Sequence, residues 1–233
     1  MNPDIEKVIN LHPDGILLSP FENSGGYGRI EKLNIPIIEC ADYMETSPLG
    51  RAEWMRFFGM LTGKEAQADS LFDTVEKAYL QLKEQVKATA DRPSVVSELK
   101  SGAAWYVPTG SSTMGRLYAD AGAHYLFNYI KGSGSVPLSF ETVLDKAQHA
   151  DYWILKYNRS ADMTLSGLQK EYAPYARFDA FGKQAVYGCN TRHIPFYEES
   201  PFHPDRLLKD FIKIFHPQLL PGYELQYFSK LAK

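Results

Sequence analysis

The sequence predicts an α/β protein with two lobes, mainly parallel sheets and one long backbone helix joining the lobes. Three observations support this prediction. Apolar residues alternate between helical and strand-like spacing at both ends of the chain. A long helical stretch, residues 64–88, contains neither Gly nor Pro. Finally, 44% hydrophobic and 23% charged side chains in 233 residues are typical of a globular protein.

The first lobe is predicted to cover residues 1–48. Apolar residues at helical spacing predict a helix over Ile5–Leu11, and "PDGILLS" then predicts an aliphatic strand. A second buried strand follows in "LNIPIIECADY". This order implies a parallel sheet, in which functional residues gather beyond the strand ends. Residues 20–27 and 41–48 occupy those places.

Residues 49–90 are predicted to form the connecting helical segment. The apolar spacing is helical, Gly63 marks a break, and the stretch after it is long for a small domain. We interpret it as a rigid strut between two lobes. A coiled-coil arm is the weaker alternative, because the heptads are not sustained.

The second lobe is predicted to cover residues 91–233. "PSVVSEL" and "AAWYV" read as paired strands, and "QAVYG" reads as a further strand. Helices are expected over 114–121, 165–172 and 206–215, and the tail "GYELQYFSKLAK" is also expected to be helical. Long loops leave the strand ends, so this lobe presents one edge rich in aromatic, Asn and Arg residues.

One helix–strand unit occurs twice, as "NPDIEKVINLHPDGILLS" and as "SFETVLDKAQHADYWILK". Each copy places a glutamate, Glu6 or Glu141, in the first turn of its helix. The helix dipole alone favours an acidic residue there. It does not explain the duplication, which suggests equivalent exposed positions suited to a symmetric partner with basic residues.

Aromatic side chains follow the strand ends of the second lobe, and packing in the core is the ordinary explanation for many of them. Arg192 in "CNTRHIPFY" is the preferred ligand-facing charge, because a guanidinium forks onto carboxylate or catecholate oxygens. Its alternative role is an ion pair with Glu198 or Glu199. The aromatic set comprises Trp105, Tyr106, Tyr157, Tyr187, Phe196 and Tyr197.

Several functional classes are poorly supported. A net charge of -3 gives no overall attraction to nucleic acid or anionic lipid. No metal-binding motif or catalytic triad is recognisable, so neither a resident metal nor another cofactor is expected. A signal peptide and a spanning helix are also unrecognisable, which leaves a cytosolic protein or a removed leader. A metal-dependent hydrolase or chelatase using His193, His203 and Glu198 remains the enzymatic alternative, and a partner-binding fragment is the third possibility.

The chain resembles the periplasmic substrate-binding proteins of ABC importers for iron-siderophores, haem and cobalamin. Four segments carry the resemblance: "IEKVINLHPDGILLS", "LNIPIIECADYMETSPLGRAEWMRFFGMLTGKEAQA", "WYVPTGSSTMGRLYADAGAHYLF" and "VPLSFETVLDKAQHADYWIL". Their order and spacing cover almost the whole chain. The resemblance implies a receptor without catalysis that captures a metal chelate and delivers it to a permease. It also implies a periplasmic location, with a lipid anchor in the full-length protein.

The resemblance also implies roles for particular residues. Glu6 and Glu141 would pair with arginines on the two permease subunits. Ligand would lie against Tyr27 and Tyr43 on one lobe and, on the other, against Trp105, Tyr106, Tyr157, Asn190 and Arg192. One departure is that members of this family have a leader and further βα units before the segment at which this chain starts. We therefore expect a first lobe that is incomplete through truncation at the N-terminus.

Overall fold

The computed structural model describes residues 4–20 and 26–233. Packing divides the chain into unit 1, residues 1–44, and unit 2, residues 45–233. The α/β prediction is confirmed: both units contain parallel strands and helices. The boundary lies four residues before the predicted one at residue 48, and the helical segment 49–90 is part of unit 2.

Unit 1 is built around one short parallel strand pair. Its β1 and β2 pair over three residues each, from Ile16↔Ile37 to Leu18↔Glu39. Helix α1 begins after Asp4, whose Oδ1 accepts hydrogen bonds from the amides of Glu6 and Lys7. These elements are where the sequence predicts them. The unit consists of α1 (Ile5–Leu11), β1 (Ile16–Leu18), η2 (Ile30–Leu33), β2 (Ile37–Glu39) and η3 (Asp42–Met44).

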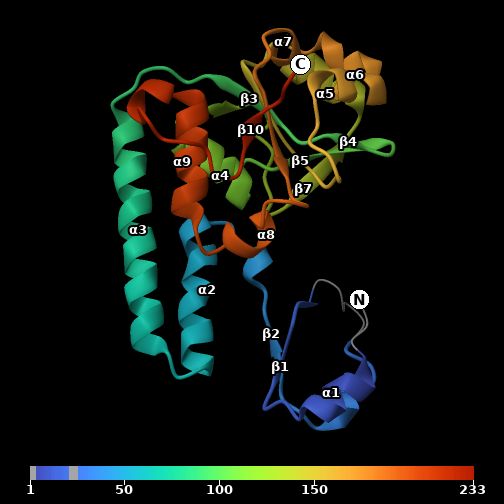
Figure 1. Cartoon of the computed structure of the whole chain (residues 1–233), viewed down its shortest axis with the longest axis vertical. Coiled ribbons are helices and arrows are strands. Elements are labelled where there is room, and N and C mark those ends of the chain that lie inside the picture. Colours follow the sequence, from blue (N-terminus) through green and yellow to red (C-terminus); the bar gives the residue numbers. More distant parts are fainter. Residues whose placement is uncertain (1–3, 21–25) are drawn as a thin grey trace. The chain divides into compact units, whose positions relative to one another are not determined.

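Unit 2 begins with two helices that pack against each other as a hairpin. Helix α2 (Pro48–Leu61) and helix α3 (Glu65–Lys87) are separated by a turn in which Gly63 has φ +63°, a conformation that favours glycine. The break predicted at Gly63 is therefore confirmed. Helix α3 is one continuous helix of 23 residues, and it packs against α2 and α9 of the same unit (Figure 1).

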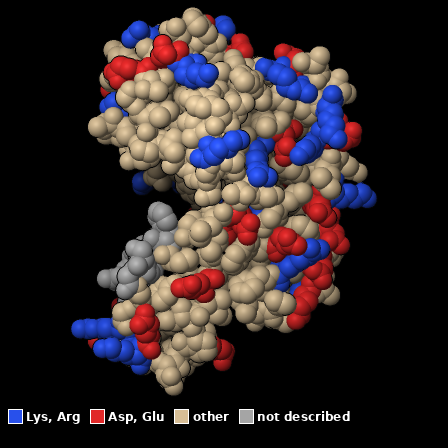
Figure 2. Space-filling view, turned by 180° about the vertical axis from the view of Figure 1, so that it is seen from behind, with Lys and Arg blue, Asp and Glu red and all other residues tan. Residues whose placement is uncertain are grey.

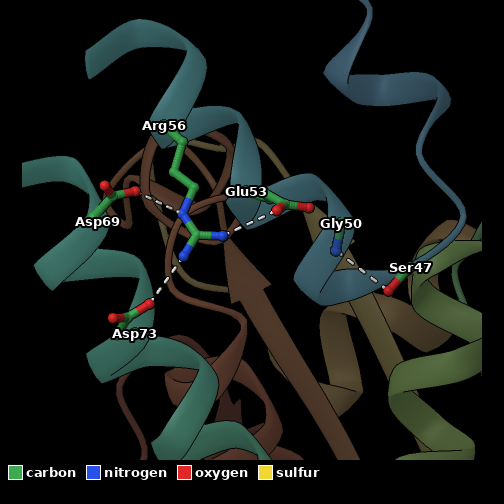
Figure 3. Close-up of polar contacts among 6 residues, drawn as sticks. All are labelled: Ser47, Gly50, Glu53, Arg56, Asp69 and Asp73. Carbon is green, nitrogen blue, oxygen red and sulfur yellow. Dashed lines mark hydrogen bonds and ion pairs between the residues drawn. The ribbon is translucent and has the colours of Figure 1, made fainter. Parts of the chain in front are cut away.

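Arg56 links the two helices of the hairpin through ion pairs. Arg56 of α2 donates hydrogen bonds to Glu53 at 3.0 Å and to Asp69 and Asp73 of α3 at 2.9 Å each (Figure 3). Its guanidinium carbon also lies 4.2 Å from the centre of the Phe72 ring. Acidic side chains gather over this hairpin in the space-filling view (Figure 2), and Arg56 offsets part of their mutual repulsion.

The main sheet of unit 2 has five strands in the order β10-β9-β8-β3-β6. All neighbours are parallel except β10, which is antiparallel to β9. Helices α3 and α9 lie on one side of this sheet and α5, α6 and α7 on the other (Figure 1). Its strands are β3 (Ser94–Ser97), β6 (His124–Tyr125), β8 (Tyr152–Tyr157), β9 (Val186–Asn190) and β10 (Ser229–Lys230).

A second sheet of unit 2 is antiparallel, with the order β4-β5-β7. The predicted pairing of "PSVVSEL" with "AAWYV" is wrong, because β3 and β5 belong to different sheets. Strand β5 packs on the main sheet through stacked aromatic rings instead: Trp105 of β5 lies 5.6 Å, between ring centres, from Trp153 of β8. The three strands are β4 (Lys100–Ser101), β5 (Ala104–Pro108) and β7 (Ser135–Leu138).

The C-terminal tail is extended, so the prediction of a helix there is wrong. The buried carboxylate of Asp210 in α9 accepts hydrogen bonds from the amides of Gln226, Tyr227 and Phe228 and from the Tyr223 hydroxyl. These donors hold the tail across α9 before β10 adds to the sheet. The remaining elements are α4 (Thr113–Asp120), α5 (Phe140–Ala147), α6 (Leu165–Glu171), η4 (Ala173–Arg177), α7 (Asp179–Gly182), α8 (Phe196–Glu199), α9 (Pro204–Phe215) and η5 (Pro217–Leu219).

Candidate ligand-binding site

The carboxyl ends of β8 and β9 form one polar edge of unit 2. The two strands run parallel, and their last residues, Tyr157 and Asn190, are register partners. Loops 158–164 and 191–195 leave the sheet from this edge. Strand ends of this kind are where open α/β sheets bind their ligands.

Asn190 organises this edge. Its Nδ2 donates to the Arg159 carbonyl at 3.0 Å and to the Asp162 carboxylate at 2.9 Å, and its Oδ1 accepts from the Arg159 amide at 3.1 Å. The side chain is 4% exposed. Because these bonds use both ends of the amide, Asn190 contributes by holding loop 158–164 in place.

A cavity of about 200 Å³ lies beside Tyr157, and we call it the tail cavity. The Tyr157 hydroxyl accepts a hydrogen bond from the Met163 amide at 3.0 Å. Burial raises the pKa of Tyr157, so its hydroxyl stays protonated. The cavity is lined by Tyr157, Asp162, Gly188, Asn190, His193, Ile194 and residues 225–229.

A second cavity, of about 120 Å³, includes the preceding residue of β8, and we call it the Lys156 cavity. Successive strand residues point to opposite faces, which separates Lys156 from Tyr157. Helices α2, α4, α8 and α9 contribute residues to the lining of the Lys156 cavity. The lining consists of Pro48, Arg51, Thr113, Met114, Leu117, Lys156, Phe196, Tyr197, Ser200, Pro201, Pro204 and Leu207.

Lys156 is the largely buried cation of this second cavity. Its side chain is 14% exposed and forms an ion pair with Glu98, which is 19% exposed. Burial alone would lower the pKa of Lys156, but the charge and hydrogen bond of Glu98 outweigh it and raise that pKa above its usual range. Lys156 is therefore charged at neutral pH. Sequence reasoning missed it, although a lysine inside the apolar run "YWILKY" is a signal.

The two predicted ligand contacts on β5, Trp105 and Tyr106, differ in exposure. Trp105 is fully buried, and its Nε1 donates to the Ser97 carbonyl at 2.9 Å. The prediction that Trp105 contacts ligand is therefore wrong, because the side chain points into the core. Tyr106 points the other way and is 50% exposed. Tyr197, the first-turn aromatic of α8, is 61% exposed.

Arg192 is exposed in the loop after β9. No ion pair joins its guanidinium to a carboxylate within residues 4–20 and 26–233, so the alternative of pairing with Glu198 or Glu199 is not realised there. Glu199 instead lies 3.9 Å from Arg206. The Arg192 side chain is available for an anionic group.

The two candidate tyrosines of unit 1 differ in their contacts. The Tyr27 hydroxyl donates to Glu39 of β2 at 2.6 Å, and its amide donates to Glu31. The hydrogen bond to Glu39 raises the pKa of Tyr27 to about 12. Tyr43 is half-buried in η3.

Glu6 and Glu141 occupy matching positions in their helices. Each lies in the first turn, after a capping residue, Asp4 for α1 and Ser139 for α5, and each side chain is exposed. Both helices then lead into a parallel strand, β1 or β8. The two carboxylates are therefore accessible to a partner.

The residues of the enzymatic alternative have other contacts. A ring nitrogen of His193 lies 3.1 Å from the Ser160 carbonyl oxygen, and Nδ1 of His203 lies 3.8 Å from Asp205. Within the described part of the chain, no group of three or more His, Cys, Asp or Glu side chains is arranged to hold a metal ion. Among those same residues, no helix has the length and hydrophobicity needed to cross a membrane.

Residues 1–192 match the family model described as periplasmic binding protein. The chain belongs to this family. Two relatives from Methanocaldococcus jannaschii, both named uncharacterized lipoproteins, are each 26% identical over 98% and 97% of the chain. The chain spans 54% and 58% of the lengths of these relatives.

Solved structures share the fold of this periplasmic binding protein family member. A periplasmic heme binding protein from Pseudomonas aeruginosa matches with a TM-score of 0.74 at 14% identity, over 99% of this chain and 81% of the other. A possible iron-binding periplasmic solute-binding protein from Staphylococcus epidermidis matches with a TM-score of 0.71 at 18% identity, over 93% and 81%. The family is described as periplasmic binding proteins, and these two neighbours are named as a heme-binding protein and a possible iron-binding protein.

Proposed function

We propose that this protein is the substrate-binding component of an ABC importer, which captures a metal chelate and delivers it to the permease. The match of residues 1–192 to the periplasmic binding protein family is the observation that carries this proposal. The names of two structural neighbours, one heme-binding and one possibly iron-binding, support a chelate as the ligand. Ferric siderophores, haem and cobalamin are the candidates.

The proposed ligand contacts of unit 2 lie at the polar edge of its main sheet and on β5. Arg192 supplies an exposed guanidinium for an anionic group, and Tyr106 supplies an exposed ring for contact area. Tyr157 and Asn190 line the tail cavity. In unit 1, Tyr27 and Tyr43 are the proposed contacts.

The proposed location is extracytoplasmic, with a lipid anchor that holds the protein at the membrane. Both relatives from M. jannaschii carry the word lipoprotein in their names, which supports this proposal. A receptor that a lipid anchor holds at the membrane beside its permease needs no membrane-spanning helix of its own.

Ligand capture is tested by tryptophan fluorescence during titration with a ferric siderophore, haem and cobalamin. All three absorb light in the tryptophan emission range and quench by energy transfer, which does not require contact with Trp54, Trp105 or Trp153. We expect saturable quenching by one of them. An absence of saturable quenching by all three would contradict chelate capture.

Docking is tested by reversing the charge of the proposed contacts. The variant Glu6→Arg plus Glu141→Arg should bind chelate as the unaltered protein does but fail to stimulate ATP hydrolysis by the importer, because arginine repels a basic partner. The matched control is Glu65→Arg plus Glu224→Arg, which makes the same charge change at two other exposed positions. Equal loss of stimulation in both variants would contradict specific docking.

A further inference from the structure

The Lys156 cavity holds a cation with unused hydrogen-bonding capacity. An ammonium group has three donors. Lys156 uses one for Glu98, and its Nζ lies 5.6 Å from the centre of the Phe196 ring. No other acceptor for this ammonium occurs in residues 4–20 and 26–233. Buried donors normally have partners, so the remaining two indicate a group that enters the cavity.

The surroundings of Lys156 make its charge effective. Pro48, Leu117 and Leu207, which line the cavity, are all buried, so they shield the ammonium from water. Charge interactions strengthen in such an environment. Glu98 holds the ammonium at one side, and its own backbone is fixed by hydrogen bonds to β8, through its amide to Ile154 and its carbonyl to the Trp153 indole. The cation is thereby held in place before any ligand arrives.

We infer that the Lys156 cavity binds an anionic oxygen group of the carried ligand, a carboxylate or a phenolate, through the Lys156 ammonium. This inference rests on the proposed function as a chelate receptor and names the chemical class of the group it recognises. Arg51 also lines the cavity. The exposed ring of Tyr197 lies at the same cavity and offers apolar contact.

The size of the cavity defines how much of a ligand it accepts. Pockets that enclose a whole drug-sized ligand measure about 300–1,000 Å³. The Lys156 cavity measures about 120 Å³, which suits a short acidic arm. The body of the chelate stays outside it, so this cavity selects ligands by an arm that ends in a negative charge.

The anion-binding step is tested with propionate, which represents an acidic arm without a chelate. The protein is labelled with carbon-13 lysine, and the Lys156 Cε signal is assigned with Lys156→Arg. We expect a saturable shift of this signal during titration with sodium propionate at constant ionic strength. We expect no such shift with propionamide, which has the same shape but no charge, and none at the exposed Lys146 with either compound.

An equal response to propionate and propionamide, or a Lys156 signal that neither compound moves, overturns the inference. Neither result bears on chelate capture, which the fluorescence titrations decide. Conversely, a protein that binds no chelate but shows the propionate shift would contradict the proposed function and leave this anion site standing.

Selectivity is tested with haem and its dimethyl ester, in which both acidic arms are neutral. Loss of one hydrogen bond to a buried charge should weaken ester binding about tenfold or more. The variant Lys156→Met plus Glu98→Gln removes both charges together, which avoids leaving Glu98 buried and unpaired. The preference for haem over the ester should shrink about tenfold in this double variant, whereas Lys146→Met should keep the full preference. An undiminished preference for haem in the double variant overturns the assignment to Lys156.

Discussion

Unit 1 and unit 2 are stabilised by different kinds of interaction. In unit 1, Ile30 is the only buried residue among those described, and Leu11 and Leu17 are 76% and 48% exposed. Local hydrogen bonds hold this unit: the Asp4 cap, the β1–β2 ladder and the Tyr27–Glu39 contact. Unit 2 has a continuous core that joins both of its sheets to α3 and α9. Unit 1 should therefore unfold at a lower free-energy cost than unit 2.

The largest expected effect is the loss of a core ring in unit 2. Trp105→Ala should lower the free energy of unfolding by roughly 3–5 kcal/mol, because it removes a fully buried indole stacked on Trp153. Urea denaturation followed by circular dichroism measures this. Tyr106→Ala, at the exposed neighbouring position, should cost under about 1 kcal/mol. Similar costs for both would mean that β5 does not bury one face.

The next effect is a loss of stability in acid that originates in unit 2. His216 is fully buried, with Nε2 3.4 Å from the Gly122 carbonyl and no partner for Nδ1 in the described chain. Burial lowers the pKa of His216, so the unfolded chain binds a proton at a higher pH than the folded chain does. The free energy of unfolding should therefore fall as pH drops below about 6.5, the ordinary value for histidine.

This pH dependence is measured by urea denaturation between neutral and mildly acidic pH. In His216→Gln the side chain cannot gain a proton in this range, so the slope should flatten. An unchanged slope in the variant would show that other groups cause the acid sensitivity.

A smaller effect is expected from the cation that clamps the α2–α3 hairpin. Arg56→Ala should cost much less free energy of unfolding than Trp105→Ala, because the Arg56 side chain is 36% exposed and exposed ion pairs contribute little each. The cost should shrink in high salt, which screens the repulsion left among Glu53, Asp69 and Asp73. Denaturation at low and high salt measures it. A salt-independent cost would assign the effect to the lost contact with Phe72 instead.

The sequence predicted most helices and strands because their signals are local. The prediction of a helix over Ile5–Leu11 matches α1, and Gly63 marks the turn between α2 and α3. The packing of α3 onto α9 could not be predicted, because it depends on contacts far apart in sequence. The pairing of β3 with β8 rather than β5 was missed for the same reason.

The candidate site was only partly predictable. Glu6 and Glu141 could be placed in first helical turns from sequence because capping residues precede them. Trp105 was misplaced because inward and outward residues of a strand differ only in register, which depends on tertiary packing. The prediction of a helical C-terminal tail failed for a similar reason, since the conformation of the tail depends on the buried carboxylate of Asp210.

The smallest expected effect on the whole chain, and the sharpest comparison of the two units, comes from the duplicated helix starts. Asp4 caps α1 and Ser139 caps α5, and removing either by Asp4→Ala or Ser139→Ala should cost its helix about 1 kcal/mol. Helix α5 buries Phe140, Val143 and Leu144 in the core, so Ser139→Ala should lower the global free energy of unfolding by that amount. Helix α1 buries none of its residues.

Asp4→Ala should therefore speed hydrogen exchange of the α1 amides several-fold while the main unfolding transition of unit 2 stays in place. Hydrogen exchange with mass spectrometry and urea denaturation, applied to both variants, separate the two outcomes. If Asp4→Ala moves the main transition as far as Ser139→Ala does, the two units unfold as one, and the contrast between local and core stabilisation does not hold.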